Sequence, residues 1–145
     1  MDEKTQTSIN LWEKMVQAYE AIKKAQVKTI FDSKLTIPQY SVLEVIYNQG
    51  PMPLKKIGEK LFVSGANITC VVDNLEKEDY VKRVPSNIDR RIIMAELTPK
   101  GLEKISKLYP QNAKNIVEVA ANLSKDEQLT LDRLLTKLSG NNNKG

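Results

Sequence analysis

The chain has 145 residues, 41% of them hydrophobic and 28% charged, with a formal net charge of +4. This length and balance suit a single domain, residues 1–145, with one modest core. With no histidine and one cysteine, Cys70, the sequence offers neither a zinc site of the usual ligands nor an internal disulfide. It also lacks a run of about 18 apolar residues that could cross a membrane, and an apolar segment of the signal-peptide kind. We therefore expect a cytoplasmic protein with no membrane contact and no cofactor.

Apolar positions spaced three or four residues apart predict a long amphipathic helix over about residues 8–31. A second helix is expected to begin at Thr36, because Thr36 and Gln39 have the spacing of a capping box. It should stop before Gly50, which is followed by a proline.

Two further helices are predicted close together. The first is short, over about residues 54–61, and the second runs to about residue 78. Only Phe62, Val63 and Ser64 separate them, and the Ser64 hydroxyl can cap the second helix. Two helices joined by so short a turn are typical of a helix-turn-helix.

Two short extended segments come next, residues 80–84 and 92–97, joined by the polar loop 85–91. β-Branched residues in both segments and turn-forming residues between them predict a β-hairpin. A hairpin directly behind a helix-turn-helix makes it winged. The predicted fold class is therefore mainly α with a small β-hairpin wing.

The rest of the chain is predicted to be helical. A helix that opens at Pro99 should reach about residue 122 and bend at Pro110, where a backbone donor is missing. A last helix covers about residues 124–138, and Ser124 and Glu127 at its start have the spacing of a further capping box. The tail, residues 140–145, is expected to be disordered because it has nothing to bury.

Four short motifs follow one another around the hairpin: Leu75-Glu76, Val81-Lys82-Arg83, Asp89-Arg90-Arg91 and Leu97-Thr98-Pro99-Lys100-Gly101. In this order and spacing they resemble the signature of the MarR family, and residues 35–40 resemble the start of that family's second helix. The resemblance covers residues 10–138. It implies a winged helix-turn-helix transcriptional regulator, a repressor by family default, that binds double-stranded DNA as a homodimer. It also implies a response to small, often aromatic, effectors.

The resemblance implies a division of roles along the chain. Residues 8–31 and 99–138 would be dimerisation helices, and residues 36–97 the winged helix-turn-helix lobe that binds DNA. The terminal helices carry apolar residues such as Trp12 and Leu131, more than a small winged domain can cover. Their pattern therefore agrees with a homodimer.

Three positions depart from the family pattern. Asp79 stands where a glycine usually follows the recognition helix, and aspartate tolerates the left-handed conformation needed there. Phe62 replaces a common glycine in the turn, which we expect it to fix by packing. Cys70 stands where an arginine is frequent, which puts one of the usual DNA contacts in doubt.

The fourth helix is expected to present short polar residues to the major groove. A rotation of about 100° per residue turns one set of residues inward: Ile68, Val72 and Leu75. The same rotation turns another set outward: Ala66, Thr69, Cys70, Asp73 and Asn74, with Asn67 between the faces. Asn67 and Thr69 can reach base edges, while Ser64 and the helix N-terminus favour a phosphate.

The wing is positively charged. Residues 80–91 carry four positive side chains and one negative, a net charge of +3. The resemblance implies that Arg91 enters the minor groove while Asp89 holds it in place. A narrow A·T-rich groove concentrates negative potential, and a pre-oriented guanidinium loses less entropy on binding. The alternative is an ordinary exposed ion pair, which contributes under about 1 kcal/mol.

The predicted DNA-binding residues are thus Ser64, Ala66, Asn67, Thr69, Cys70, Asn74, Arg83, Asp89, Arg90 and Arg91. Two other functions compete with DNA binding. An enzyme is disfavoured, because the sequence has no histidine, no glycine-rich phosphate loop and no paired-carboxylate motif. A protein-interaction module that uses the winged fold without DNA is the alternative, since a fold alone does not decide function.

Overall fold

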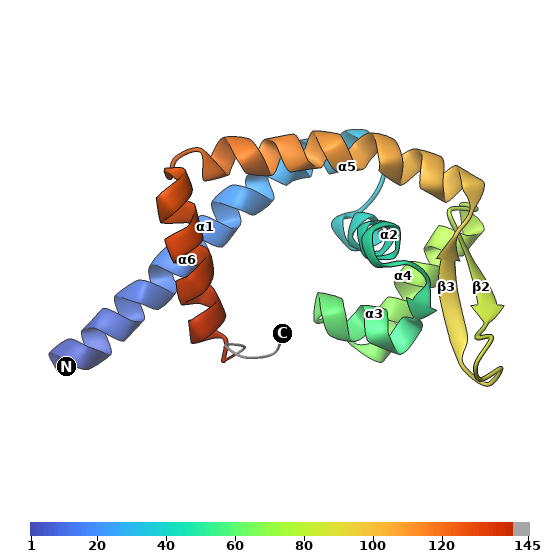
Figure 1. Cartoon of the computed structure of the whole chain (residues 1–145), viewed down its shortest axis with the longest axis horizontal. Helices are drawn as coiled ribbons and strands as arrows, with labels where there is room; N and C mark the ends of the chain where they lie inside the picture. The colour runs from blue at the N-terminus through green and yellow to red at the C-terminus, as the bar shows by residue number, and fades with distance from the viewer. Residues whose placement is uncertain (141–145) are drawn as a thin grey trace. The chain divides into compact units, whose positions relative to one another are not determined.

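The computed structural model describes residues 1–140 and is mainly helical with one small sheet (Figure 1). In chain order the elements are α1 (Glu3–Asp32), α2 (Ile37–Gln49), β1 (Met52–Pro53), α3 (Leu54–Leu61), α4 (Gly65–Lys77), β2 (Val81–Pro85), β3 (Ile93–Leu97), α5 (Pro99–Ala120) and α6 (Lys125–Leu138). The predicted fold class is confirmed. Of the tail expected to be disordered, residues 141–145 lie outside the described residues. Contacts divide the chain into two compact units, residues 26–113 and residues 1–25 with those from 114 onward.

Two predicted helix starts have the expected caps. The Thr36 hydroxyl accepts a hydrogen bond from the Gln39 N–H at 3.2 Å, and Gln39 Oε1 accepts one from the Thr36 N–H at 2.9 Å. This completes the capping box that begins α2. Ser124 and Glu127 make the same two hydrogen bonds at the start of α6. Each pair satisfies backbone donors that a helix end otherwise leaves free.

Two long helices differ from the prediction in detail. α1 begins at Glu3, earlier than the apolar stripe indicates, because Asp2 Oδ1 accepts a hydrogen bond from the Thr5 N–H at 2.9 Å. α5 continues through Pro110 and ends at Ala120. The bend expected at the proline stays a prediction.

The wing is a three-stranded antiparallel sheet in the order β1-β3-β2. β2 and β3 form the predicted hairpin, with Arg83 opposite Ala95 at its centre. Sequence reasoning misses β1, because two residues flanked by a proline carry no alternating pattern. Met52 of β1 pairs with Ala95 on the other side, and both side chains are buried. β1 therefore attaches the hairpin to the start of α3.

The hydrophobic core lies in the unit of residues 26–113. It is built from the end of α1, from α2, α3 and α4, from the sheet and from the first half of α5. Its side chains that are at most 3% exposed are Ile30, Tyr40, Val42, Leu43, Ile46, Ile57, Ile68, Val72, Leu75, Val81, Ala95 and Ile105. The three inward residues predicted for α4 are all in this set, so the orientation of that helix is confirmed.

The other unit has no core of its own. No residue is buried among residues 1–25 and 114–140. Large apolar side chains stay open to solvent on all three helical segments of this unit: Leu11, Trp12, Val16, Tyr19, Ile22, Ile116, Val117, Leu129, Leu131, Leu134, Leu135 and Leu138. Since helix stability in proteins comes mostly from packing an apolar face, these segments lack that support in a single chain. No helix within residues 1–140 is both long and apolar enough to span a membrane.

A tight junction joins α4, β2 and α5. Asp79 adopts the left-handed conformation expected of it, with φ of 63°, and the Tyr80 N–H donates to the Leu75 carbonyl at 2.9 Å. The Thr98 N–H donates to the Tyr80 carbonyl at 3.1 Å, and the Thr98 hydroxyl donates to the Asp79 carbonyl. Gly101 lies so close that a Cβ there would be 1.9 Å from the Tyr80 carbonyl oxygen. The start of α5 therefore fixes the point where α4 passes into the wing.

Candidate nucleic-acid interface

α3 and α4 form the predicted helix-turn-helix. The Ser64 hydroxyl accepts a hydrogen bond from the Asn67 N–H at 3.4 Å, and the Ser64 carbonyl accepts one from the Ile68 N–H at 2.9 Å. Ser64 is therefore the N-cap of α4, as predicted. The N-terminal end of α4 is exposed to solvent at Gly65 and Ala66, where small side chains let the backbone approach a ligand closely.

The outward face of α4 is polar and nearly as predicted. Ala66, Asn67, Thr69, Cys70 and Asn74 are all exposed. The Thr69 hydroxyl donates to the Gly65 carbonyl at 2.9 Å, which fixes its rotamer and leaves its oxygen lone pairs able to accept. Asn67 and Asn74 carry amides, which can donate and accept at base edges. This face can thus enter a major groove.

The expectation that Phe62 packs into the turn is wrong. Its side chain is 97% exposed. Its backbone is left-handed, with φ of 57°, and the Val63 N–H donates to the Gly58 carbonyl at 2.9 Å. These are the features of a helix end that normally uses glycine, and they explain why glycine is common at this position. The backbone hydrogen bonds, and not the ring, fix the turn.

The tip of the wing holds a pre-oriented arginine. Asp89 Oδ1 accepts hydrogen bonds from the Arg91 backbone N–H and from Nε, both at 3.1 Å, and Oδ2 accepts one from Nη2 at 3.0 Å. These hydrogen bonds lower the pKa of the Asp89 carboxyl, so the pair stays charged at neutral pH. The Arg91 side chain is nevertheless 90% exposed. The guanidinium is thus oriented but still free to meet a phosphate or a groove.

Arg83 has a different environment from the arginines of the tip. Its guanidinium contacts Asp73 at 2.5 Å and Glu76 at 2.9 Å, and its backbone N–H donates to Glu76 Oε2 at 3.2 Å. Both carboxylates belong to α4, so Arg83 ties β2 of the wing to the recognition helix. This also explains why Asp73, predicted to face outward, is only partly exposed. A DNA contact by Arg83 stays a prediction. Arg90, at the tip of the wing, is exposed to solvent.

Sequence reasoning missed Ile88 as a member of this surface. It precedes Asp89 in the loop, and its side chain is 99% exposed. The Ser86 hydroxyl accepts hydrogen bonds from the backbone N–H groups of Ile88 and Asp89, at 3.2 and 3.5 Å, and so shapes the loop. The signal that the sequence offered for Ile88 was its position as an apolar residue in an otherwise polar loop.

The comparisons with known proteins agree with this geometry. The MarR family matches residues 35–93. The chain is 32% identical over 137 residues to the HTH-type transcriptional regulator MhqR of Bacillus subtilis (strain 168), covering 94% of each chain. A structure of mutant MarR from E. coli in complex with operator DNA has a TM-score of 0.81 at 22% identity, covering 95% of this chain and 99% of that chain. The structure of Bordetella bronchiseptica BpsR, reported for the regulation of its DNA binding by 6-hydroxynicotinic acid, has a TM-score of 0.77 at 25% identity. The match to BpsR covers 88% of this chain and 91% of that chain.

The motifs, the fold and the relatives lead to one assignment. The winged helix-turn-helix matches solved MarR structures along nearly the whole chain. The family consists of transcriptional regulators and not of enzymes, which removes the enzyme alternative. The chain belongs to the MarR family and is a DNA-binding transcriptional regulator.

Proposed function

We propose that the chain is a repressor that binds an inverted repeat as a homodimer and is released by a small-molecule effector. The observation that carries the DNA-binding part is the wing tip, where Arg91 is held by three hydrogen bonds and is still 90% exposed. An ordinary exposed ion pair contributes little to stability. A pre-oriented guanidinium at the end of a loop is instead well suited to a narrow minor groove.

The remaining contacts follow from the faces described above. α4 lies in the major groove, with Asn67, Thr69 and Asn74 at base edges and Ser64 near a phosphate. Ala66 and Cys70 line the same face, and Arg90 adds a phosphate contact beside Arg91. Phe62 and Ile88 add apolar contacts, since each is almost fully exposed and lies within two residues of a predicted DNA-binding residue, Ser64 or Asp89.

A second copy of the chain supplies the missing cover for the terminal helices. The exposed apolar residues of α1, the end of α5 and α6 need a partner surface, and none is buried within the single chain. We therefore propose residues 8–31 and 99–138 as dimerisation helices and residues 36–97 as the DNA-binding lobe. A two-fold dimer presents two copies of α4, which requires two half-sites of opposite direction.

The proposals of repression and of release by an effector are based on membership of the MarR family and on one similar protein. The DNA binding of BpsR is regulated by 6-hydroxynicotinic acid, a small aromatic acid. A comparable small molecule is proposed here as the signal. A regulator of transcription acts where the DNA is, so the proposed location is the cytoplasm.

Selection of duplexes from a random DNA pool tests this function. We expect an inverted repeat whose half-sites lie about 10 base pairs apart, one helical turn. If the dimer neutralises about 8 phosphates, the logarithm of the binding constant should fall with the logarithm of salt concentration with a slope near −7. Equal affinity for scrambled duplexes, or a slope near zero, would favour the protein-interaction module instead.

A further inference from the structure

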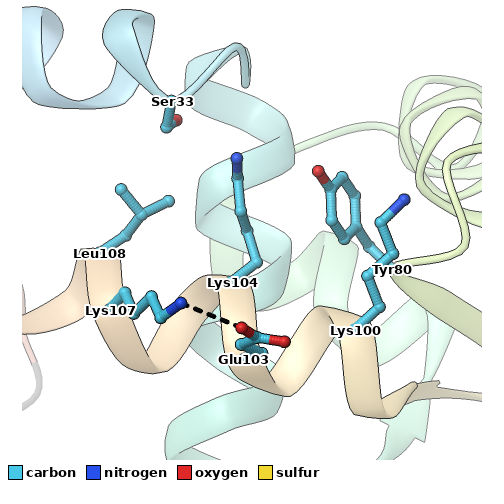
Figure 2. A pocket seen from close by; sticks show the side chains of 7 residues that line it. All are labelled: Ser33, Tyr80, Lys100, Glu103, Lys104, Lys107 and Leu108. Carbon is cyan, nitrogen blue, oxygen red and sulfur yellow. Dashed lines mark hydrogen bonds and ion pairs between the residues drawn. The ribbon is translucent and has the colours of Figure 1, made fainter.

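Phe62, in the turn between α3 and α4, is an aromatic residue without a packing partner. Its side chain is 97% exposed. Other aromatic rings of the same unit have partners. The Tyr47 and Tyr109 rings lie with their centres 5.6 Å apart. The Lys100 ammonium lies 4.7 Å from the centre of the Tyr80 ring (Figure 2). Within residues 1–140 the Phe62 ring makes no contact of either kind, so burial gives no reason for a phenylalanine here.

The backbone conformation of Phe62 also disfavours this residue type. Its φ of 57° is left-handed, a region that glycine adopts without the steric cost that other residues incur. The Phe62 N–H donates to the Glu59 carbonyl at 3.4 Å, and the Val63 N–H donates to the Gly58 carbonyl at 2.9 Å. These backbone hydrogen bonds hold the turn without help from the ring. A residue that strains the backbone and buries nothing is explained by a contact with another molecule.

The ring is continuous with the surface that we place in the major groove. An open groove of about 800 Å³ is lined by Phe62 together with Ser64, Gly65 and Thr69, all at the start of α4. Ser64 and Thr69 are two of the proposed DNA contacts. Phe62 precedes Ser64 by two residues, and two residues span at most about 7 Å. The ring therefore lies beside the N-terminal end of α4, which is the end that meets the bases.

The chemistry of this groove favours an apolar group of the DNA over a phosphate. Lys55 and Glu59 are the charged residues of its lining, and their charges cancel. A phosphate would therefore gain no net attraction there. The apolar group that base edges display in the major groove is the 5-methyl group of thymine, and a phenylalanine ring can cover it.

We propose that Phe62 is a specificity-determining residue, whose ring packs on the 5-methyl group of one thymine in each half-site. The chain would then require thymine at that position. This inference rests on the proposed placement of α4 in the major groove. Burial of one methyl group should change the affinity about fourfold for each half-site.

Duplexes in which deoxyuridine replaces thymine test this contact, because the exchange removes the methyl group and keeps every hydrogen-bonding group of the base. The exchange is made at one position at a time, in both half-sites of a selected duplex, and the dissociation constant is measured at fixed salt concentration. At one position the wild type should bind about sixteenfold more weakly, fourfold for each half-site. At that position the exchange should not change the affinity of Phe62→Ala, which has no ring to lose the contact.

Two further variants make the test specific. Ile88→Ala removes another almost fully exposed apolar side chain, on the wing, and should keep the full wild-type loss at that position. Phe62→Gly should lose the methyl effect as Phe62→Ala does. It should also raise the urea midpoint of unfolding, because its φ suits glycine and the lost ring packs against nothing. A more stable protein that no longer detects the methyl group cannot owe that loss to unfolding.

The outcomes separate this contact from the proposed function. If the wild type binds the selected duplex but tolerates deoxyuridine at every position, the inference is overturned and the proposed function stands. The same conclusion follows if Phe62→Ala and Phe62→Gly keep the full loss at every position where the wild type shows one. Equal affinity of the wild type for selected and scrambled duplexes would overturn the proposed function and this contact together.

Discussion

Replacing Gly101 with alanine should cost about 3 kcal/mol or more of folding stability, which is a large part of the few kcal/mol by which small domains are stable. The new Cβ would lie 1.9 Å from the Tyr80 carbonyl oxygen and 2.9 Å from its carbon. Both are backbone atoms at the junction of α4 and β2, so neither can rotate away as a side chain would. Relief of the overlap has to move α5 away from the junction and break the Thr98 hydrogen bonds.

Urea unfolding at fixed protein concentration, without DNA, measures this effect. Gly65→Ala is the matched control, because nothing lies within 4 Å of a Cβ there and its φ is not positive. In the first turn of α4 the control should change stability by no more than about 1 kcal/mol, and in the stabilising direction. Equal unfolding midpoints for Gly101→Ala and Gly65→Ala would show that the junction is not as tight as described.

Replacing Arg91 with alanine should weaken binding to a selected duplex by about 1–3 kcal/mol and leave folding stability unchanged. The side chain is 90% exposed, and within residues 1–140 it forms an ion pair only with Asp89, so its removal disturbs no packing. The loss should fall mostly at A·T-rich flanks, where the minor groove is narrow. The salt slope should become shallower by about 1, because one cationic contact is removed. Asp89→Ala should have a smaller effect, since the arginine stays but is no longer held.

Ile88→Ala is the matched control within the same loop. It removes an uncharged side chain that is 99% exposed, so any loss of affinity should leave the salt slope unchanged. Lys137→Ala removes one positive charge far along the sequence and should change neither quantity. Binding of Arg91→Ala that equals wild type in strength and salt slope would reduce the Asp89–Arg91 pair to a surface ion pair.

Local rules predicted most of the fold. The capping boxes at Thr36 and Ser124, the N-cap at Ser64 and the left-handed Asp79 depend on a few neighbouring residues, and all are found. The inward face of α4 was predictable because helical periodicity fixes it. The predictions that failed concern features that depend on residues distant in sequence. β1 forms because β3 offers it a partner, and whether the Phe62 side chain finds a packing partner depends on the other elements, which leave it 97% exposed.

In the candidate site, too, the sequence predicted the contacts between residues close in sequence better than those between distant ones. The Asp89–Arg91 pair involves residues two apart, and its motif indicated it correctly. The position of Arg83 was harder, since its partners, Asp73 and Glu76, are on another element and meet it only after β2 folds beside α4.

The central claim is that a homodimer binds an inverted repeat, and the mass of the complex on DNA tests it most directly. Sedimentation equilibrium at micromolar concentration would be run on the protein alone, on its complex with a selected duplex, and on a duplex with one half-site scrambled. We expect two chains in the free protein and two chains per duplex, with binding strongly weakened by loss of one half-site. A stable, folded monomer that binds the half-site duplex as tightly as the full one would contradict it.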